Sequence, residues 1–220
     1  MIAWVLVLLM TFSPFVSLGE NVTGTWIQNK EENLLAIKAA LDQDPQNEMY
    51  QYLWTFENNS NIFFNFQDNG VLLIETCEYY QWTLQGNKLT MQMGTPENIS
   101  QEYTMTYLEQ KNKILWKQPG SETEMILEKI EGTTPGLLGK WHFADDETTD
   151  YTLFQEDHTV LSVSTVFFQY HTQEDGFLIL TDERDDFEMK FSYLLNDEIL
   201  QLISPDDGST LYLLERWNKE

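Results

Sequence analysis

The chain of 220 residues contains one cysteine, three histidines and few basic side chains. A single cysteine, Cys77, excludes an intramolecular disulfide. In the strand-like run Ile74–Tyr79 we expect it to be a buried, unreactive thiol, because flanking glutamates raise a thiol pKa. Twelve Lys and Arg against 36 Asp and Glu give a net charge of −24. Neither half has a basic stripe, so the sequence predicts no binding to nucleic acid or to anionic membrane surfaces.

Motifs of the common catalytic and metal sites are also missing. His142, His158 and His171 lie in the second half of the chain, but they are not spaced as metal ligands. The acidic runs Asp145–Glu147 and Asp182–Asp186 lack an EF-hand pattern, and we interpret them as solvated turns. No Gly-x-Ser-x-Gly and no phosphate-binding glycine loop is present. The sequence therefore predicts a protein that is not an enzyme and holds no cofactor or metal.

The first nineteen residues carry no charged side chain and contain a long apolar run. Pro14 and the small residues Ser17 and Gly19 favour cleavage before Glu20. We therefore predict a signal peptide at residues 1–19, with an uncleaved membrane anchor as the alternative. The mature protein is expected to be secreted, or to lie in the periplasm or cell envelope, with no membrane span.

The most informative feature present is an internal repeat, because six short blocks recur in the same order in both halves. Residues 20–131 and 137–220 are predicted to be the two copies, joined by a short linker of turn formers at 131–136. The matching blocks are Gly24–Trp26 with Gly139–Trp141, Phe66–Leu72 with Phe154–Leu161 (one residue added), Tyr79–Trp82 with Phe167–Tyr170, Gly86–Leu89 with Gly176–Leu178, Tyr107–Leu115 with Tyr193–Leu200, and Leu127–Lys129 with Leu214–Arg216.

Each copy reads as a series of short strands joined by hairpin turns. Apolar and polar residues alternate through Phe187–Tyr193, Leu89–Met93 and Tyr103–Tyr107, so each of these strands has one apolar face. Asn-Gly and Asp-Gly pairs between such runs tolerate the positive φ of tight hairpins. A meander with one apolar face is best closed into a barrel, since closure removes its edges. The predicted fold is therefore all-β, with two tandem antiparallel meander barrels.

The first copy carries an insertion between its first two strands. Its helix formers and the apolar spacing of Leu34, Ile37 and Leu41 predict one α-helix near residues 31–42. Asp42–Pro45 is expected to end the helix. The helix could serve as a lid over a barrel mouth. We favour the alternative, in which it plugs the barrel end or packs on the neighbouring domain.

Gly-x-Trp on a first strand, with a basic residue on the last strand, resembles the lipocalin-like (calycin) barrels. The likeness is closest to compact bacterial lipocalin-like domains and covers nearly all of the mature chain as two tandem copies. The resemblance implies that a tryptophan closes each barrel and that a basic side chain packs across its ring. Carried over within each copy, Trp26 would pair with Lys129, and Trp141 with Arg216.

The resemblance also implies a binding role, for a small hydrophobic ligand or for a partner outside the cytoplasm. Six aromatic residues at matching places in the two copies are the predicted ligand-lining residues. The alternative hypothesis is a structural or protein-interaction module whose barrels are filled by their own side chains, because an eight-stranded barrel has little spare interior. The six residues are Tyr79, Tyr80, Trp82, Phe167, Phe168 and Tyr170.

Overall fold

The computed structural model describes residues 21–95, 98–117, 123–132, 136–144, 149–173, 176–182 and 187–217, and side chains at 95 and 98–100 are not part of that description. The predicted signal peptide at 1–19 lies outside the described residues. So does the acidic run Asp145–Glu147, and of Asp182–Asp186 only Asp182 is described. Within these ranges the protein is mostly β, with two helices near the N-terminus.

Two helices interrupt the strands between β1 and β2, and they are α1 (Glu31–Gln43) and α2 (Glu48–Asn59). The strands are β1 (Gly24–Gln28), β2 (Ser60–Phe66), β3 (Val71–Gln85), β4 (Lys88–Thr95), β5 (Asn98–Leu108), β6 (Lys113–Lys117), β7 (Glu124–Glu131), β8 (Gly139–Phe143), β9 (Tyr151–Phe154), β10 (Thr159–Thr172), β11 (Phe177–Asp182), β12 (Phe187–Leu195), β13 (Ile199–Ile203) and β14 (Thr210–Arg216).

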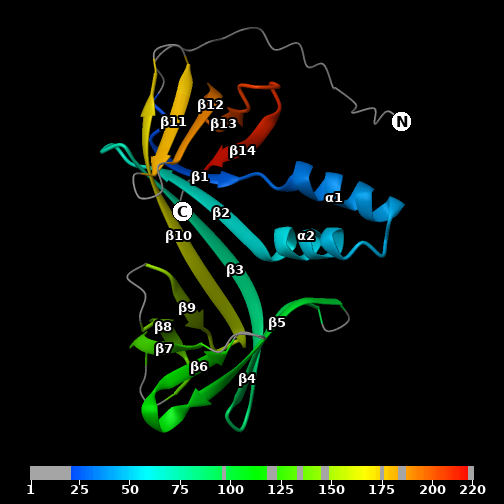
Figure 1. Cartoon of the computed structure of the whole chain (residues 1–220), viewed down its shortest axis with the longest axis vertical. Helices are drawn as coiled ribbons and strands as arrows, with labels where there is room; N and C mark the ends of the chain where they lie inside the picture. Colours follow the sequence, from blue (N-terminus) through cyan, green and yellow to red (C-terminus); the bar gives the residue numbers. More distant parts are fainter. Residues whose placement is uncertain are drawn as a thin grey trace.

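All the strands of the described residues belong to one antiparallel sheet that closes into a ring of 14 strands. The ring is pinched at its middle, where β3 pairs with β10 along Val71–Gln81 and Thr159–Gln169. The pinch creates two lobes that share these two long strands (Figure 1). The first lobe contains β1, β2 and β11–β14, and the second lobe contains β4–β9. With β3 and β10 included, the circuit of each lobe has eight strands.

The prediction of two tandem barrels, each built from one copy, is wrong. β1 pairs with β2 and with β14, so the first lobe joins the start of copy one to the end of copy two. β8 pairs with β7 and β9, so the second lobe joins the end of copy one to the start of copy two. The physical reason is the length of β3 and β10, each of which runs through the pinch and carries its chain from one lobe into the other.

The local strand and turn predictions are confirmed. Leu89, Met91 and Met93 are buried in the second lobe, whereas Phe191 is buried in the first. The intervening polar residues lie on the outer face, as a period of two requires. Each lobe consequently has its own hydrophobic core, with Trp141 in the second lobe and Trp26 in the first.

Matching contacts bind the two copies to each other at the pinch. Tyr170 donates its backbone N–H to Gly70 O at 2.7 Å, and its hydroxyl to Gln67 O at 2.8 Å. Trp82 makes the same pair of bonds to the other copy, from its backbone N–H to His158 O and from its indole Nε1 to Gln155 O (2.9 and 3.2 Å). Each long strand thus hydrogen-bonds to the turn that precedes the other.

The two turns have the same length, so the extra residue expected in copy two is absent. β3 begins five residues after Phe66, and β10 begins five residues after Phe154. His158 therefore stands where copy one has Gly70, and both have positive φ (65° and 80°).

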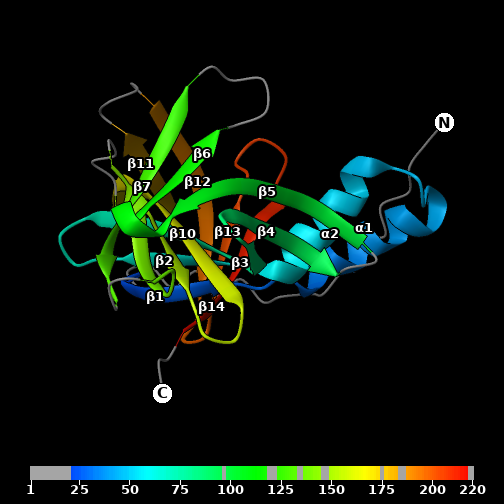
Figure 2. The same ribbon diagram turned by 90° about the horizontal axis from the view of Figure 1, so that it is seen from below.

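The predicted helix near 31–42 is confirmed as α1, but α2 was not predicted. Asn47 begins α2 by accepting hydrogen bonds from the backbone N–H groups of Met49 and Tyr50. The helical hairpin leaves the first lobe and returns to it, yet α2 packs against β4 and β5 of the second lobe. Figure 2 shows the hairpin projecting to one side, with β4 and β5 beside α2. The hairpin therefore bridges the two lobes.

Neither described helix combines the length and the apolar character needed to cross a bilayer.

Candidate functional site

One tryptophan lies fully buried in each lobe, held in the same way in both. The indole of Trp26 donates a hydrogen bond to Val22 O at 2.9 Å, and that of Trp141 donates to Leu137 O at 2.8 Å. Both rings have no exposed surface. A basic side chain covers each ring, as the family resemblance implies, but the partners are exchanged.

Arg216 lies over Trp26, with its Cζ 4.3 Å from the ring centroid, and Lys129 lies over Trp141, with its Nζ at 5.5 Å. The predicted pairs Trp26–Lys129 and Trp141–Arg216 are therefore wrong. The cause is strand pairing, since Trp26 is opposite Arg216 across β1–β14 and Trp141 is opposite Lys129 across β7–β8. That the four residues close the lobes stays a prediction.

Backbone contacts fix both basic side chains. Arg216 Nε donates to Asp197 O at 2.8 Å, and Lys129 Nζ donates to Gly136 O at 2.6 Å. Burial lowers the pKa of Lys129. The glycine of each Gly-x-Trp is required here: a Cβ on Gly24 would lie 3.0 Å from Arg216 Nη1, and one on Gly139 would lie 2.2 Å from a backbone oxygen. Both glycines also have φ above +120°.

The six predicted ligand-lining aromatics do not form one pocket. Tyr79 and Phe167 are exposed (42% and 38%) on the outer face of the shared strands. Tyr80 is buried in the core of the second lobe, and Trp82 packs against that core. The two remaining residues, Phe168 and Tyr170, pack against the core of the first lobe.

A row of aromatic rings crosses the second lobe, and only Tyr80 of this row was predicted. The centroids of Tyr80 and Tyr103 lie 5.8 Å apart, those of Tyr103 and Trp116 5.5 Å, and those of Trp116 and Phe143 6.0 Å. We call Tyr80, Tyr103, Trp116 and Phe143 the aromatic row. It runs from β3 through β5 and β6 to β8. Tyr80 is buried, whereas the other three rings pack on the core and keep part of their surface exposed.

Helix α2 brings a further aromatic side chain to the same core. Phe56 packs against the core of the second lobe and stacks on Tyr52 at 6.1 Å. At the base of the hairpin Lys30 Nζ donates to Ser60 O at 2.8 Å, and burial lowers the pKa of Lys30. Helix α1 packs on α2 and buries no side chain completely. The apolar spacing within 48–59 was the sequence signal for this contact. The segment is also rich in aromatic residues, which are common in strands, and this composition hides the helix.

Polar groups lie at the Tyr80 end of the aromatic row. The Tyr80 hydroxyl donates a short hydrogen bond to the Glu78 carboxylate, and Gln101 Oε1 lies 3.4 Å from the same hydroxyl. Burial, and then the bond to Glu78, raise the pKa of Tyr80 far above its usual value. Burial and the charge of Glu78 also raise the pKa of Tyr103. Both phenols consequently stay protonated at neutral pH, and Tyr80 uses its one proton in the bond to Glu78.

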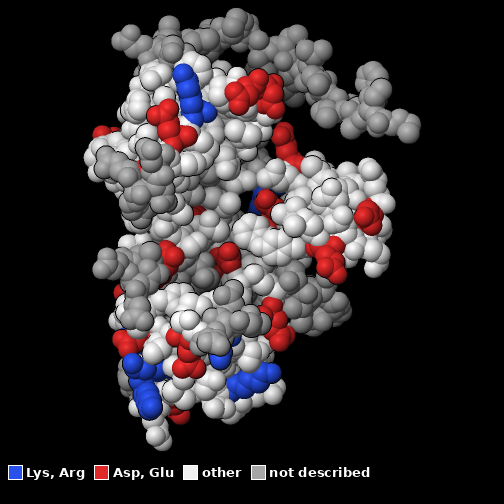
Figure 3. Space-filling model, viewed as in Figure 1, with Lys and Arg blue, Asp and Glu red and all other residues white. Residues whose placement is uncertain are grey.

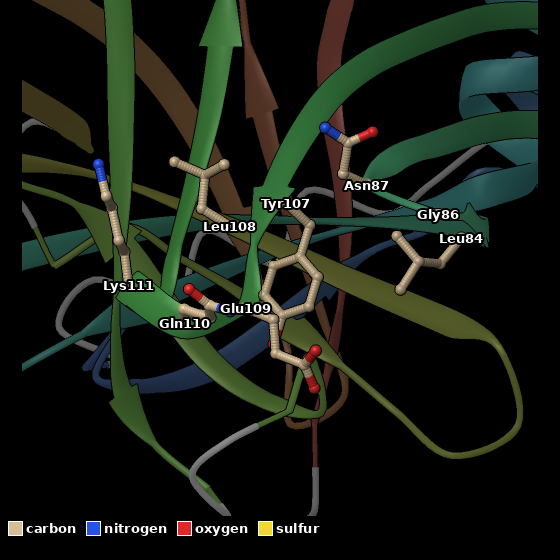
Figure 4. Close-up of a pocket in the computed structure, with 8 residues that line it drawn as sticks. All are labelled: Leu84, Gly86, Asn87, Tyr107, Leu108, Glu109, Gln110 and Lys111. Atoms are coloured by element: carbon tan, nitrogen blue, oxygen red, sulfur yellow. The ribbon is translucent and has the colours of Figure 1, made fainter.

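A hollow of about 390 Å³ lies between the β3–β4 turn and the β5–β6 turn of the second lobe. Figure 4 shows the Tyr107 ring at its centre, with the side chains of Leu84 and Leu108 to either side. Tyr107 also packs edge-on against Trp141 at 6.1 Å, so the hollow lies near the buried tryptophan of the second lobe. Its lining mixes apolar groups with Glu109 and Lys111. Two smaller hollows, of about 340 and 200 Å³, are more polar.

The histidines and the cysteine do not come together in a reactive group. His142 lies on β8, His158 in the turn before β10, and His171 near the end of β10. Over the described ranges, no three side chains of His, Cys, Asp or Glu cluster as metal ligands would. Burial, and then the charge of Glu75, raise the pKa of the Cys77 thiol, which disfavours the nucleophilic thiolate.

The surface carries the charge expected from the composition. Figure 3 shows acidic side chains spread over both lobes and the hairpin, whereas basic side chains gather mainly near the lower end of the second lobe. A field of this sign favours neutral or cationic ligands and partners over anionic ones.

The sequence of the first copy matches a known family. Residues 22–115 match the family model described as a lipocalin-like domain, from just before β1 into β6. This match identifies one lipocalin-like domain, and the family model does not show a second copy. No curated protein and no solved structure matches the chain.

Proposed function

We propose that this chain is a secreted, non-enzymatic binding protein, and that a small, planar, apolar ligand binds at the aromatic row of the second lobe, beside α2. The lipocalin-like domain at residues 22–115 supports a binding role and includes Tyr80, Tyr103 and Phe56. The proposal includes removal of residues 1–19 on export to the cell exterior or envelope.

The observation that carries the proposal is the partial exposure of three neighbouring rings. Tyr103, Trp116 and Phe143 are partly exposed although they pack on a hydrophobic core. Such rings leave apolar surface open to a ligand, and an aromatic contact with them adds about 0.5–1.5 kcal/mol per pair beyond the area buried. The Tyr103 hydroxyl can donate a hydrogen bond near one end of the row, whereas the Tyr80 proton is already donated to Glu78. A planar hydrophobic molecule with a hydrogen-bond acceptor suits this surface, and the acidic field disfavours an anionic one.

The test is titration with a neutral, planar, environment-sensitive probe, N-phenyl-1-naphthylamine. We expect its fluorescence to rise on binding, and Trp116→Leu and Tyr103→Leu to weaken binding at least tenfold. Tyr212→Leu is the matched control, because Tyr212 is a partly buried ring that packs on Phe64 in the first lobe at 5.3 Å. Equal weakening by all three substitutions would show that the probe reports a general destabilisation of the fold, and it would contradict the proposed site.

A second function, a protein-interaction module with filled lobes, is favoured by two observations. Large side chains fill the core of each lobe, among them Trp26, Phe66 and Phe191 in the first. The hairpin exposes apolar side chains at Leu35 (68%) and Met49 (62%). Native mass spectrometry of the protein purified from its own source separates the two functions. A retained small molecule supports the ligand carrier, and a retained polypeptide supports the interaction module.

The same sample tests export. The proposal predicts that the intact mass of the mature protein corresponds to a chain that begins at Glu20. A mass that includes Met1–Gly19 would contradict secretion by cleavage and would favour the membrane anchor.

A further inference from the structure

We infer that the two copies are obligate partners that associate by exchanging strands. Neither lobe therefore depends for its assembly on the linker that joins the copies. Each copy has strand edges that no strand of the same copy pairs with. These edges are its binding surface, and the partner that fits them is a second copy of the same repeat.

Strand pairing gives the first line of support. Copy one contributes β1, β2 and the start of β3 to the first lobe, but it contributes the rest of β3 and β4–β7 to the second lobe. Copy two divides in the same way at β10. Each copy alone would therefore leave unpaired edges at β1, β3 and β7, which the other copy covers through β14, β10 and β8.

The reciprocity of the contacts gives the second line. Trp26 of copy one packs under Arg216 of copy two, and Trp141 of copy two packs under Lys129 of copy one. The bonds that Tyr170 makes to the turn of copy one repeat those of Trp82 to the turn of copy two. Two copies related in this way form the same interactions twice, which is the pattern of a closed two-fold association.

The third line is the length of the shared strands. At about 3.3 Å per residue, the 15 residues of β3 extend roughly 50 Å, more than twice the roughly 17–20 Å of a typical strand. No Gly, Pro, Asn or Asp interrupts Val71–Gln85 or Thr159–Thr172. Because none of these four turn-forming residue types lies at the pinch, neither strand is predicted to fold back there into the lobe it comes from.

The first test uses the full chain with a protease site inserted between Thr133 and Pro135. After complete cleavage we expect the halves to elute as one species, at the volume of the uncut protein, and to separate only in denaturant. Two peaks of half size under native conditions would overturn the inference.

The second test maps which strands are neighbours, by cross-linking cysteine pairs in this cleavable chain with Cys77→Ser. Ile27 faces Glu215 across β1–β14, so Ile27→Cys with Glu215→Cys should react with a short bis-maleimide. The product should remain full-length on a denaturing gel after cleavage, because the cross-link joins the two halves.

The matched control places both cysteines in copy two. His142→Cys with Glu215→Cys reproduces the pair that tandem barrels would bring together, since His142 follows Trp141 as Ile27 follows Trp26. In the exchanged structure His142 instead faces Glu128 across β7–β8. We expect the control to yield separate halves without an internal cross-link. An internal cross-link in the control, with none in the Ile27 pair, would overturn the inference.

Discussion

At the scale of single residues, the two buried tryptophans, Trp26 and Trp141, differ in the cation that covers them. Arg216 lies closer to its ring than Lys129 does, and its planar guanidinium can stack on the indole while Nε binds a backbone oxygen. Lys129 places a single ammonium 5.5 Å from the ring centroid and bonds it to Gly136 O. The cation–tryptophan contact of the first lobe is therefore expected to be the stronger of the two.

Substitution of the two cations by methionine measures this difference. Methionine keeps an unbranched apolar side chain and removes the charge, so Arg216→Met should lower the free energy of unfolding by about 1–2 kcal/mol. Lys129→Met should cost less, since part of its interaction is offset by the burial that lowers the pKa of Lys129. Urea denaturation provides the measurement, with the exposed Lys111→Met as control. A larger loss from Lys129→Met than from Arg216→Met would contradict the expected order.

Asp157 is expected to make the stability of the turn before β10 depend on pH. Hydrogen bonds from the hydroxyl and the backbone N–H of Thr159 lower the pKa of the Asp157 carboxyl. A carboxyl whose pKa is lower in the folded state stabilises the fold above its unfolded pKa of about 3.9, and this contribution is lost as pH falls through the folded value.

Asp157→Asn removes that titration and keeps an oxygen that can accept from Thr159. Asn69 already serves this way in the other copy, where its Oδ1 accepts from Val71 N at 3.1 Å. We expect the free energy of unfolding to fall less between pH 5 and pH 2 in the variant than in the unmodified protein, as measured by urea titrations at fixed ionic strength. Parallel curves would show that the carboxylate adds no pH-dependent stability.

At the scale of elements, strands and turns follow from local sequence, whereas pairing between the copies does not. Alternation and turn residues were enough to predict strands such as Leu89–Met93, and the spacing of Leu34 and Ile37 was enough to predict α1. The partner of each tryptophan could not be derived, because Lys129 and Arg216 occupy equivalent positions in the repeat and satisfy the same chemistry. Only the uninterrupted length of β3 and β10 carried a signal for exchange.

The candidate site was less accessible to sequence reasoning than the strands. Tyr103 and Trp116 lie on the neighbouring strands β5 and β6, whereas Phe143 comes from β8 and reaches Trp116 only because the second lobe closes between β7 and β8. Phe56 joins them from a helix that was not predicted. Matching positions in the repeat led instead to residues such as Tyr79 and Phe167, which the outer face of the pinch exposes.

The turn before β10 offers a test of backbone strain at this scale. His158 has φ of 65°, a conformation that costs a non-glycine residue roughly 1–2 kcal/mol, but its ring lies 4.6 Å from that of Trp82. His158→Ala keeps the strain and loses the ring contact, so it should destabilise the protein. His158→Gly relieves the strain, as Gly70 does in the other copy, and should be about 1 kcal/mol more stable than the alanine variant. Thermal unfolding monitors both, and equal midpoints would contradict this account.

At the scale of the whole molecule, the shared strands tie the stability of one lobe to that of the other. β3 and β10 line both cores, through Leu72 in the first lobe and Tyr80 and Val160 in the second. If one lobe unfolded, long edges of β3 and β10 would lose their partner strands. The other lobe, which shares these strands, would be destabilised. The net charge of −24 acts against compactness in both lobes alike. Two cores joined in this way are expected to unfold together, although each is large enough to appear as a separate unit.

Matched core substitutions decide whether the lobes unfold together. Leu89 in the second lobe and Leu178 in the first are both fully buried, so each Leu→Ala change should cost about 2–5 kcal/mol. Coupled lobes predict a single calorimetric transition in the unmodified protein, lowered as a whole by either substitution, with equal calorimetric and van't Hoff enthalpies. Independent barrels predict two transitions, of which Leu89→Ala shifts one and Leu178→Ala the other. The second pattern would show that β3 and β10 join the lobes without coupling them, even if cross-linking confirms the exchange.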